Sequence, residues 1–132
     1  MDNRTRQIKL IGESEFQTTL KSLYGRVLCL SSKRCYPSHV ARIAVSLVDP
    51  DDIVDKLESG CCSPDAPWAK APKIASVRLP LDEKPALDAI VAKLLASDYP
   101  HANYTMAVHG AICALAEWTD DEISQGISVS SE

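Results

Sequence analysis

Polar and apolar positions follow the same order twice along the chain. Residues 6–10 alternate as in a short strand, and two longer apolar-periodic segments and a short acidic segment follow, which predicts one strand and three helices. Residues 74–126 repeat this order. We therefore expect two copies of one unit, residues 4–60 and 73–126, with a proline-containing linker at 61–72.

The apolar positions of the two copies correspond at a nearly constant spacing along the chain. They form the inner face of each strand and one stripe along each of the two longer helices. The corresponding sets are Ile8 and Leu10 with Val77 and Leu79; Phe16, Leu20 and Leu23 with Leu87, Val91 and Leu94; and Val40, Ile43, Ala44, Leu47 and Val48 with Val108, Ala111, Ile112, Leu115 and Ala116. One strand and two amphipathic helices cannot bury an apolar face alone, so we expect each half to pack on the other. The chain should then fold as a monomer.

Capping residues and prolines mark the helix boundaries. Pro37 suits a first helical turn, Asn103 is a good N-cap, and Asp49 before Pro50 both ends one helix and caps the next. The expected longer helices are residues 14–30, 37–48, 83–97 and 103–118. The tail after Gly126 carries no packing signal, so we expect it to fray.

Composition allows one compact core and no membrane span. The chain has 132 residues and 45% hydrophobic residues, which suits a single domain over 1–132. No apolar run approaches the roughly 18 to 20 residues that cross a membrane. The first residues lack the apolar segment of a signal peptide, so we expect a cytoplasmic protein with its five cysteines reduced.

Charge is distributed unevenly along the chain. The formal net charge is −4, but residues 1–48 carry eight Lys or Arg and three acidic residues, whereas residues 49–132 carry six and fifteen. A polyanion would meet a local basic surface and not the sum, so the net charge does not exclude nucleic acid. We expect Lys21 and Arg26 to be ordinary solvated residues on the outer face of their helix.

The order strand, helix, helix resembles the ribbon-helix-helix family of bacterial DNA-binding proteins. The resemblance rests on the strand ending Val77-Arg78-Leu79-Pro80 and the acidic helix start at Asp82-Glu83, and it covers roughly residues 73–118. Residues 4–48 match less well, because Ile11-Gly12 replaces the proline after the strand. The resemblance implies a mostly helical fold with a two-stranded antiparallel β-ribbon, in which the two units of one chain form a pseudodimer.

The resemblance also implies a function and partners. In this family the ribbon enters the major groove of double-stranded DNA and its outward side chains read the bases. Tandem copies on one chain are a feature of conjugation accessory proteins that assist a relaxase at a transfer origin. Double-stranded DNA, and a relaxase or another DNA-transfer protein, are therefore the expected partners. A transcriptional repressor with the same fold is an alternative.

Strand alternation identifies the side chains that would read bases. With Ile8, Leu10, Val77 and Leu79 facing inward, the outward set is Thr5, Gln7, Lys9, Ile74, Ser76 and Arg78. Arg or Lys can donate to guanine, Gln can pair with adenine, and Thr or Ile can contact a thymine methyl. Because the two strands differ, the expected DNA site is asymmetric. The alternative is that these residues are only the solvated side of an amphipathic strand.

The starts of the two second helices are candidates for phosphate contacts. Unsatisfied N–H groups at a helix N-terminus favour an anion, and in the family this helix start holds the DNA backbone beside the ribbon. The corresponding residues here are Lys33, Arg34, Tyr36, Ser38, Asn103, Tyr104 and Thr105. Alternatively, the two tyrosines are cap residues that pack on their own helices.

Catalysis, metals and cofactors find little support. The chain has no phosphate-binding glycine loop and no metalloprotease motif, and His109 lies beside an apolar stripe, where a packed core residue is expected. We expect no catalytic residue, no metal site and no cofactor. The main rival function is a non-catalytic interaction module. Its acidic faces would bind a basic protein through Asp49, Asp51, Asp52, Asp120, Asp121 and Glu122.

Overall fold

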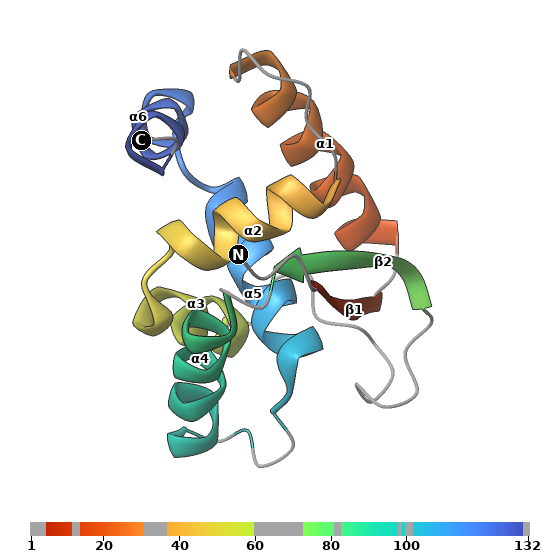
Figure 1. Cartoon of the computed structure of the whole chain (residues 1–132), viewed down its shortest axis with the longest axis vertical. Helices are drawn as coiled ribbons and strands as arrows, with labels where there is room; N and C mark the ends of the chain where they lie inside the picture. The colour runs from red at the N-terminus through yellow and green to blue at the C-terminus, as the bar shows by residue number, and fades with distance from the viewer. Residues whose placement is uncertain are drawn as a thin grey trace.

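The structure, a computed structural model, describes residues 5–11, 14–30, 37–59, 73–80, 83–97, 99 and 102–130 (Figure 1). The elements of the first half are β1 (Thr5–Ile11), α1 (Ser14–Leu30), α2 (Pro37–Leu47) and α3 (Pro50–Glu58). Those of the second half are β2 (Lys73–Pro80), α4 (Lys84–Ala96), α5 (Tyr104–Ala116) and α6 (Asp120–Ser130). The fold is mostly helical with a two-stranded antiparallel sheet, which confirms this part of the prediction. The expected linker at 61–72 lies outside the described residues.

Capping residues fix the helix starts where the sequence placed them. Asp49 caps α3 by accepting a hydrogen bond from the Asp51 backbone N–H at 2.9 Å, and Pro50 follows at the start of the helix. Asn103 caps α5 by accepting from the Met106 N–H, also at 2.9 Å. Each cap satisfies one of the backbone donors that the first turn of a helix leaves unpaired.

The two strands pair over their whole length. Ile8 lies opposite Val77, with Gln7 opposite Arg78 and Lys9 opposite Ser76, and the register shifts between Leu10 and Ile11. Ile8 and Val77 are also equivalent positions in the two copies of the sequence pattern. The middle of the ribbon therefore pairs two corresponding positions of the sequence pattern.

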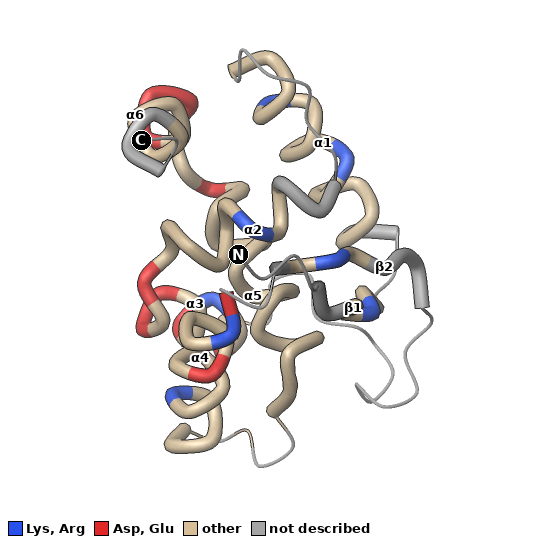
Figure 2. Tube along the Cα trace, viewed as in Figure 1, with Lys and Arg blue, Asp and Glu red and all other residues tan. Residues whose placement is uncertain are grey.

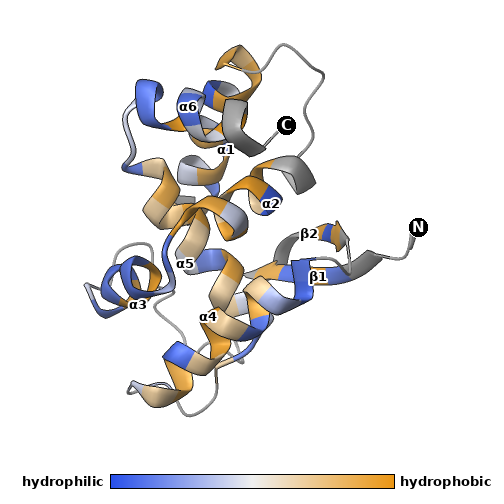
Figure 3. Cartoon of the chain, turned by 60° about the vertical axis from the view of Figure 1, so that its left-hand side comes forward, coloured by the Kyte–Doolittle hydropathy of each residue, from blue (hydrophilic) through white to orange (hydrophobic). Residues whose placement is uncertain are grey.

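Helix α5 lies at the centre of the molecule (Figures 1 and 3). Helices α1, α2, α3 and α4 all pack against it, and β1 lies on it as well, whereas β2 lies on α2. Each strand thus packs on the second helix of the other half. The third helices behave alike, because α3 packs on α4 and α5 while α6 packs on α1 and α2. Buried side chains of both halves form one core.

The second helices of the two halves differ in burial. Every residue of α5 from Met106 to Leu115 is buried, whereas α2 exposes Arg42 and Ser46 on one side. The predicted stripe of α5 is buried as expected, but the residues between its positions are buried as well, so the expectation of an amphipathic helix is wrong for α5. His109 is fully buried there and stacks on Phe16 with ring centroids 3.9 Å apart, as expected of a core residue.

The end of the chain also departs from the prediction. Helix α6 continues through Gly126 to Ser130, where the sequence predicted a frayed tail. Ile127 is half-buried against the core, one helical turn after the fully buried Ile123. The apolar pair at i and i+4 holds the last turns on the molecule, because both side chains face the same way.

Arg26 is not the ordinary solvated residue that its position predicted. Its Nε donates to Asp120 at 2.9 Å, and its Nη1 donates to the Ala116 carbonyl at 2.8 Å. It thereby satisfies the C-terminal end of α5 and ties α1 to the start of α6. A related contact joins Lys93 of α4 to Asp51 at the start of α3, at 3.1 Å.

Candidate functional site

The two faces of the ribbon have opposite character. The inner face is buried and apolar, formed by Ile8, Leu10, Val77 and Leu79. The outer face exposes Gln7, Lys9 and Arg78. This is the alternation predicted from the sequence, and it follows from the two-residue period of a strand with one face on a core.

The register of the strands places residues of β1 directly opposite residues of β2. Gln7 lies opposite Arg78 and Lys9 opposite Ser76, on either side of the buried Ile8–Val77 pair. Side chains directly opposite on one face have Cβ atoms about 4.5 to 5.5 Å apart. On the outer face, exposed Gln7 and Arg78 therefore form a neighbouring pair, with exposed Lys9 two residues further along β1.

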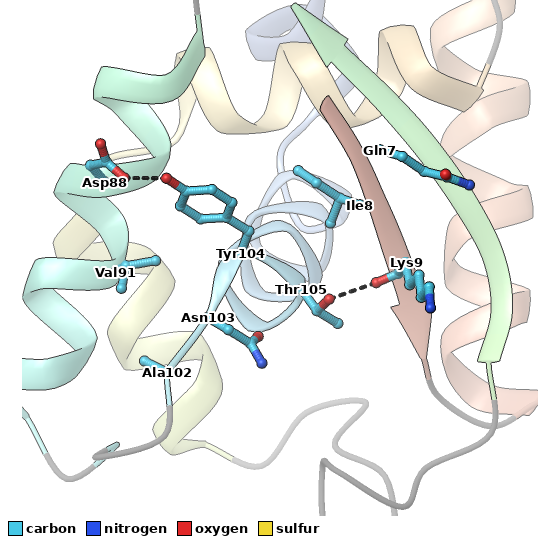
Figure 4. A pocket seen from close by; sticks show the side chains of 9 residues that line it. All are labelled: Gln7, Ile8, Lys9, Asp88, Val91, Ala102, Asn103, Tyr104 and Thr105. Carbon is cyan, nitrogen blue, oxygen red and sulfur yellow. Dashed lines mark hydrogen bonds between the residues drawn. The ribbon is translucent and has the colours of Figure 1, made fainter. Parts of the chain in front are cut away.

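A surface pocket of about 560 Å³ adjoins this outer face (Figure 4). It lies between β1, α4 and the start of α5. Its lining residues are Gln7, Ile8, Lys9, Asp88, Val91, Ala102, Asn103, Tyr104 and Thr105. The structure thus brings two predicted base-reading residues together with the three predicted phosphate contacts of the second half.

The three residues at the start of α5 already make contacts within the protein. Asn103 caps the helix, and the Thr105 hydroxyl donates to the Lys9 carbonyl at 2.8 Å. The Tyr104 hydroxyl donates to Asp88 of α4 (Figure 4). The Thr105 contact joins the start of α5 to the ribbon.

Asp88 is a pocket residue that the sequence analysis missed. Its carboxylate accepts from Tyr104 and from Lys84 one turn earlier, whose Nζ lies 2.8 Å away. The Lys84–Asp88 pair, at i and i+4, was visible in the sequence as an ordinary helix-surface pair. Nothing local indicated that this pair would face the ribbon, because Lys9 and Asp88 belong to different halves of the chain.

Several predicted site residues lie outside the described part of the chain. Lys33, Arg34 and Tyr36 are among them. Thr5, Ser38, Ile74 and Ser76 have described backbone only. On the backbone, Ser38 lies in the first turn of α2, while Thr5 and Ser76 pair with Pro80 and Lys9.

The ribbon differs in charge from helices α3 and α6 (Figure 2). The strands contain four charged residues, Arg6, Lys9, Lys73 and Arg78, all of them basic. The acidic residues of α3 and α6 lie on the other side of α5 from the ribbon (Figure 2). The ribbon is thus a basic edge on a chain whose net charge is −4.

Two other features, a metal site and a membrane-spanning helix, are not found among the described residues. No group of three or more His, Cys, Asp or Glu side chains among them is placed to hold a metal ion. No described helix is both long and apolar enough to pass through a bilayer.

Comparison with models of protein families, with curated protein sequences and with solved structures found no match to this chain.

Proposed function

We propose that the chain binds double-stranded DNA by inserting the outer face of its β-ribbon into the major groove. The observation that carries this proposal is the ribbon itself. One face of the ribbon packs on the core. The other face exposes Gln7 and Arg78, which lie opposite one another, and Lys9, two residues further along β1. A two-stranded ribbon fits the major groove, and these side-chain types can bond base edges.

The distribution of charge also supports the binding of DNA at the ribbon. The charged residues of both strands are all basic, whereas the acidic helices α3 and α6 lie on the opposite side. A phosphate backbone would therefore attract the ribbon edge and repel the far side, which would orient the protein on approach. Binding should weaken steeply with salt, because neutralised phosphates release counterions.

In this proposal the two halves are two ribbon-helix-helix units that form a pseudodimer within one chain. Ile8 and Val77 pair in the ribbon and are equivalent in the repeat, as an approximate two-fold axis through that pair requires. Exchanging the halves also exchanges the packing pairs, since β1 lies on α5 as β2 lies on α2. The second unit then occupies the surface that a partner chain would use, so a monomer is expected.

The two half-sites would not be identical. The axis makes Lys9 equivalent to Arg78, but it makes Gln7 equivalent to Ser76 and Thr5 to Ile74. A basic residue is retained at one position of each strand, whereas the residues beside it differ between the strands. The preferred duplex should therefore be an imperfect or non-palindromic site.

The biological role that we propose is an accessory one in DNA transfer, beside a relaxase or a similar protein. It rests on the tandem arrangement, in which the chain resembles the C-terminal domain of the overdrive-binding virulence protein of T-DNA transfer. A repressor would use the same ribbon. DNase footprinting on transfer-origin duplexes and on promoter duplexes would separate the two roles.

The rival function, a module that binds a basic protein through its acidic helices, is less favoured. Asp51 and Asp120 already pair with Lys93 and Arg26, and Asp49 caps α3. These residues have structural roles that account for their position without a partner.

Single substitutions on the ribbon test the DNA-binding proposal. Duplexes recovered by selection from a random library would serve as probes in anisotropy titrations. Arg78→Ala and Lys9→Ala should each weaken binding to the selected duplex by about 1 to 3 kcal/mol and reduce its preference over a scrambled duplex. Both variants should stay folded, because the two side chains are exposed.

The matched control is Val77→Asp on the inner face. Val77 is fully buried, so this variant should unfold by placing an unpaired charge in the core. If the two alanine variants remain folded and bind normally, the ribbon does not read DNA and the proposal is wrong.

A further inference from the structure

We infer that Asp88 limits DNA affinity at the pocket beside the ribbon, by repelling phosphate and by occupying the hydroxyl of Tyr104. This role depends on the proposed DNA binding and adds a residue that opposes it. Asp88 lies on α4, and no repeat or strand pattern in the sequence placed it at the ribbon.

The position of Asp88 is the first reason. It lines the pocket opposite Gln7 and Lys9, which belong to the outer face of β1 (Figure 4). The start of α5 forms the rest of the wall. A DNA backbone following the ribbon edge would bring phosphate to this pocket, and a carboxylate there would repel it.

The contacts of Asp88 are the second reason. The Tyr104 hydroxyl donates to one carboxylate oxygen, and Lys84 lies 2.8 Å from the other. Both are groups that could otherwise donate to a phosphate. Asp88 therefore removes one donor and neutralises one cation at the place where the proposed interface would use them.

The exposure of Asp88 is the third reason. Its side chain is 47% exposed and that of Lys84 is 54% exposed, so the pair lies at the surface. Exposed ion pairs contribute little to folding stability, typically under about 1 kcal/mol. The Lys84–Asp88 pair therefore adds little to folding stability, and Asp88 can be substituted in a folded protein.

Two substitutions at Asp88 separate charge from hydroxyl capture. Asp88→Asn keeps an acceptor for Tyr104 but loses the charge, and it should bind random-sequence duplex roughly two- to fivefold more tightly at low salt. Asp88→Ala also releases the hydroxyl, and it should bind up to about tenfold more tightly, because a hydrogen bond to a charged group becomes possible.

Tyr104→Phe completes a double-mutant cycle. Combined with Asp88→Ala, it should return the affinity to that of Asp88→Asn. The control for net charge is Asp55→Asn, on an exposed position of α3 far from the ribbon, where affinity should not change.

The outcomes distinguish this role from the proposed function. A native protein that fails to bind duplex at low salt overturns the proposed function. A native protein that binds, with Asp88 variants no tighter than Asp55→Asn, overturns the role of Asp88 alone. If Asp88→Ala does not fold, Asp88→Asn still decides the contribution of charge.

Discussion

Helices α2 and α5 are the second helices of the two halves in chain order, but they have different surroundings. Arg42 of α2 and Gly110 of α5 are equivalent positions of the repeat. Arg42 is exposed, and its Nε lies 3.0 Å from Glu83 at the start of α4. Gly110 is buried, and a Cβ added there would lie 2.7 Å from Ile53 of α3. Arg42 thus faces solvent and forms a salt bridge, whereas Gly110 packs against helix α3.

The difference teaches that repetition of a pattern does not imply equal roles in the core. Helix α3 lies directly over α5, because a glycine on α5 permits the close approach. Helix α5 thereby becomes the central element, with neighbours on every side. Helix α2 keeps one side in solvent and remains amphipathic. Helix α5 is therefore the scaffold on which helices of both halves pack.

The largest expected effect separates Leu115 from its equivalent, Leu47. Leu115 is fully buried in α5, and Leu115→Ala should lower the free energy of unfolding by about 3 to 5 kcal/mol. Leu47 is half-buried, so Leu47→Ala should cost only about 1 to 2 kcal/mol. Urea titrations of both variants measure the difference. Equal losses would mean that the two helices contribute equally and that the comparison is wrong.

Glycine substitutions should give effects of opposite sign in a buried and an open helix position. Gly110→Ala would bring its new methyl to 2.7 Å from Ile53 and 3.0 Å from Leu57, so it should destabilise by about 1 to 3 kcal/mol. Gly25 of α1 has nothing within 4 Å of an added Cβ. Gly25→Ala should stabilise by up to about 1 kcal/mol, the usual helix preference for alanine.

Thermal melts of the two glycine variants, measured together, provide the test. Any general effect of alanine on helices acts equally on both variants and cancels in their difference. A stabilised Gly110→Ala variant would show that α3 can move away from α5 at little cost, and the close contact would then have no structural role.

Local features of the fold could be predicted from the sequence. The alternation in the strands and the caps at Asp49 and Asn103 act within a few residues, so the chain alone reveals them. A signal for the burial of α5 was also present, since the helix contains no Lys, Arg, Asp or Glu. A helix that is apolar all round is buried on all sides. The repeat compares only the apolar stripe positions of α2 and α5. It therefore gives no information on the residues that lie between those positions within each helix.

Long-range pairings could not be predicted in this way. Arg26 and Asp120 come from opposite ends of the chain and meet only because α1 and α6 pack together. Tyr104 and Asp88 meet across a pocket that exists only in the folded chain. The ribbon residues of the candidate site could therefore be predicted, because strand alternation alone determines which side chains face outward. Asp88 on α4 could not be predicted, because only tertiary packing brings it to the pocket.

The smallest expected effect concerns how the third helices of the two halves begin. Helix α3 starts with a single cap, Asp49, and a proline, whereas α6 starts with a reciprocal capping box. The Thr119 N–H donates to Glu122 at 2.9 Å, and the Glu122 N–H donates to the Thr119 hydroxyl at 3.2 Å. The hydrogen bonds from Thr119, first that of its backbone N–H and then that of its side chain, lower the pKa of Glu122 from its ordinary value of 4.5.

This lowered pKa predicts a pH-dependent stabilisation of α6. The folded state favours the ionised carboxylate, so the stabilisation is fully present above pH 4.5 and is lost as the pH falls through the folded pKa below that value. Glu122→Gln keeps an acceptor but cannot ionise. The native protein should therefore be slightly more stable than Glu122→Gln at pH 7, and the difference should vanish in acid. Thermal melts of both proteins from pH 7 to pH 3 measure it. A difference that stays constant over this range would mean that the capping box depends on its shape and not on the charge of Glu122.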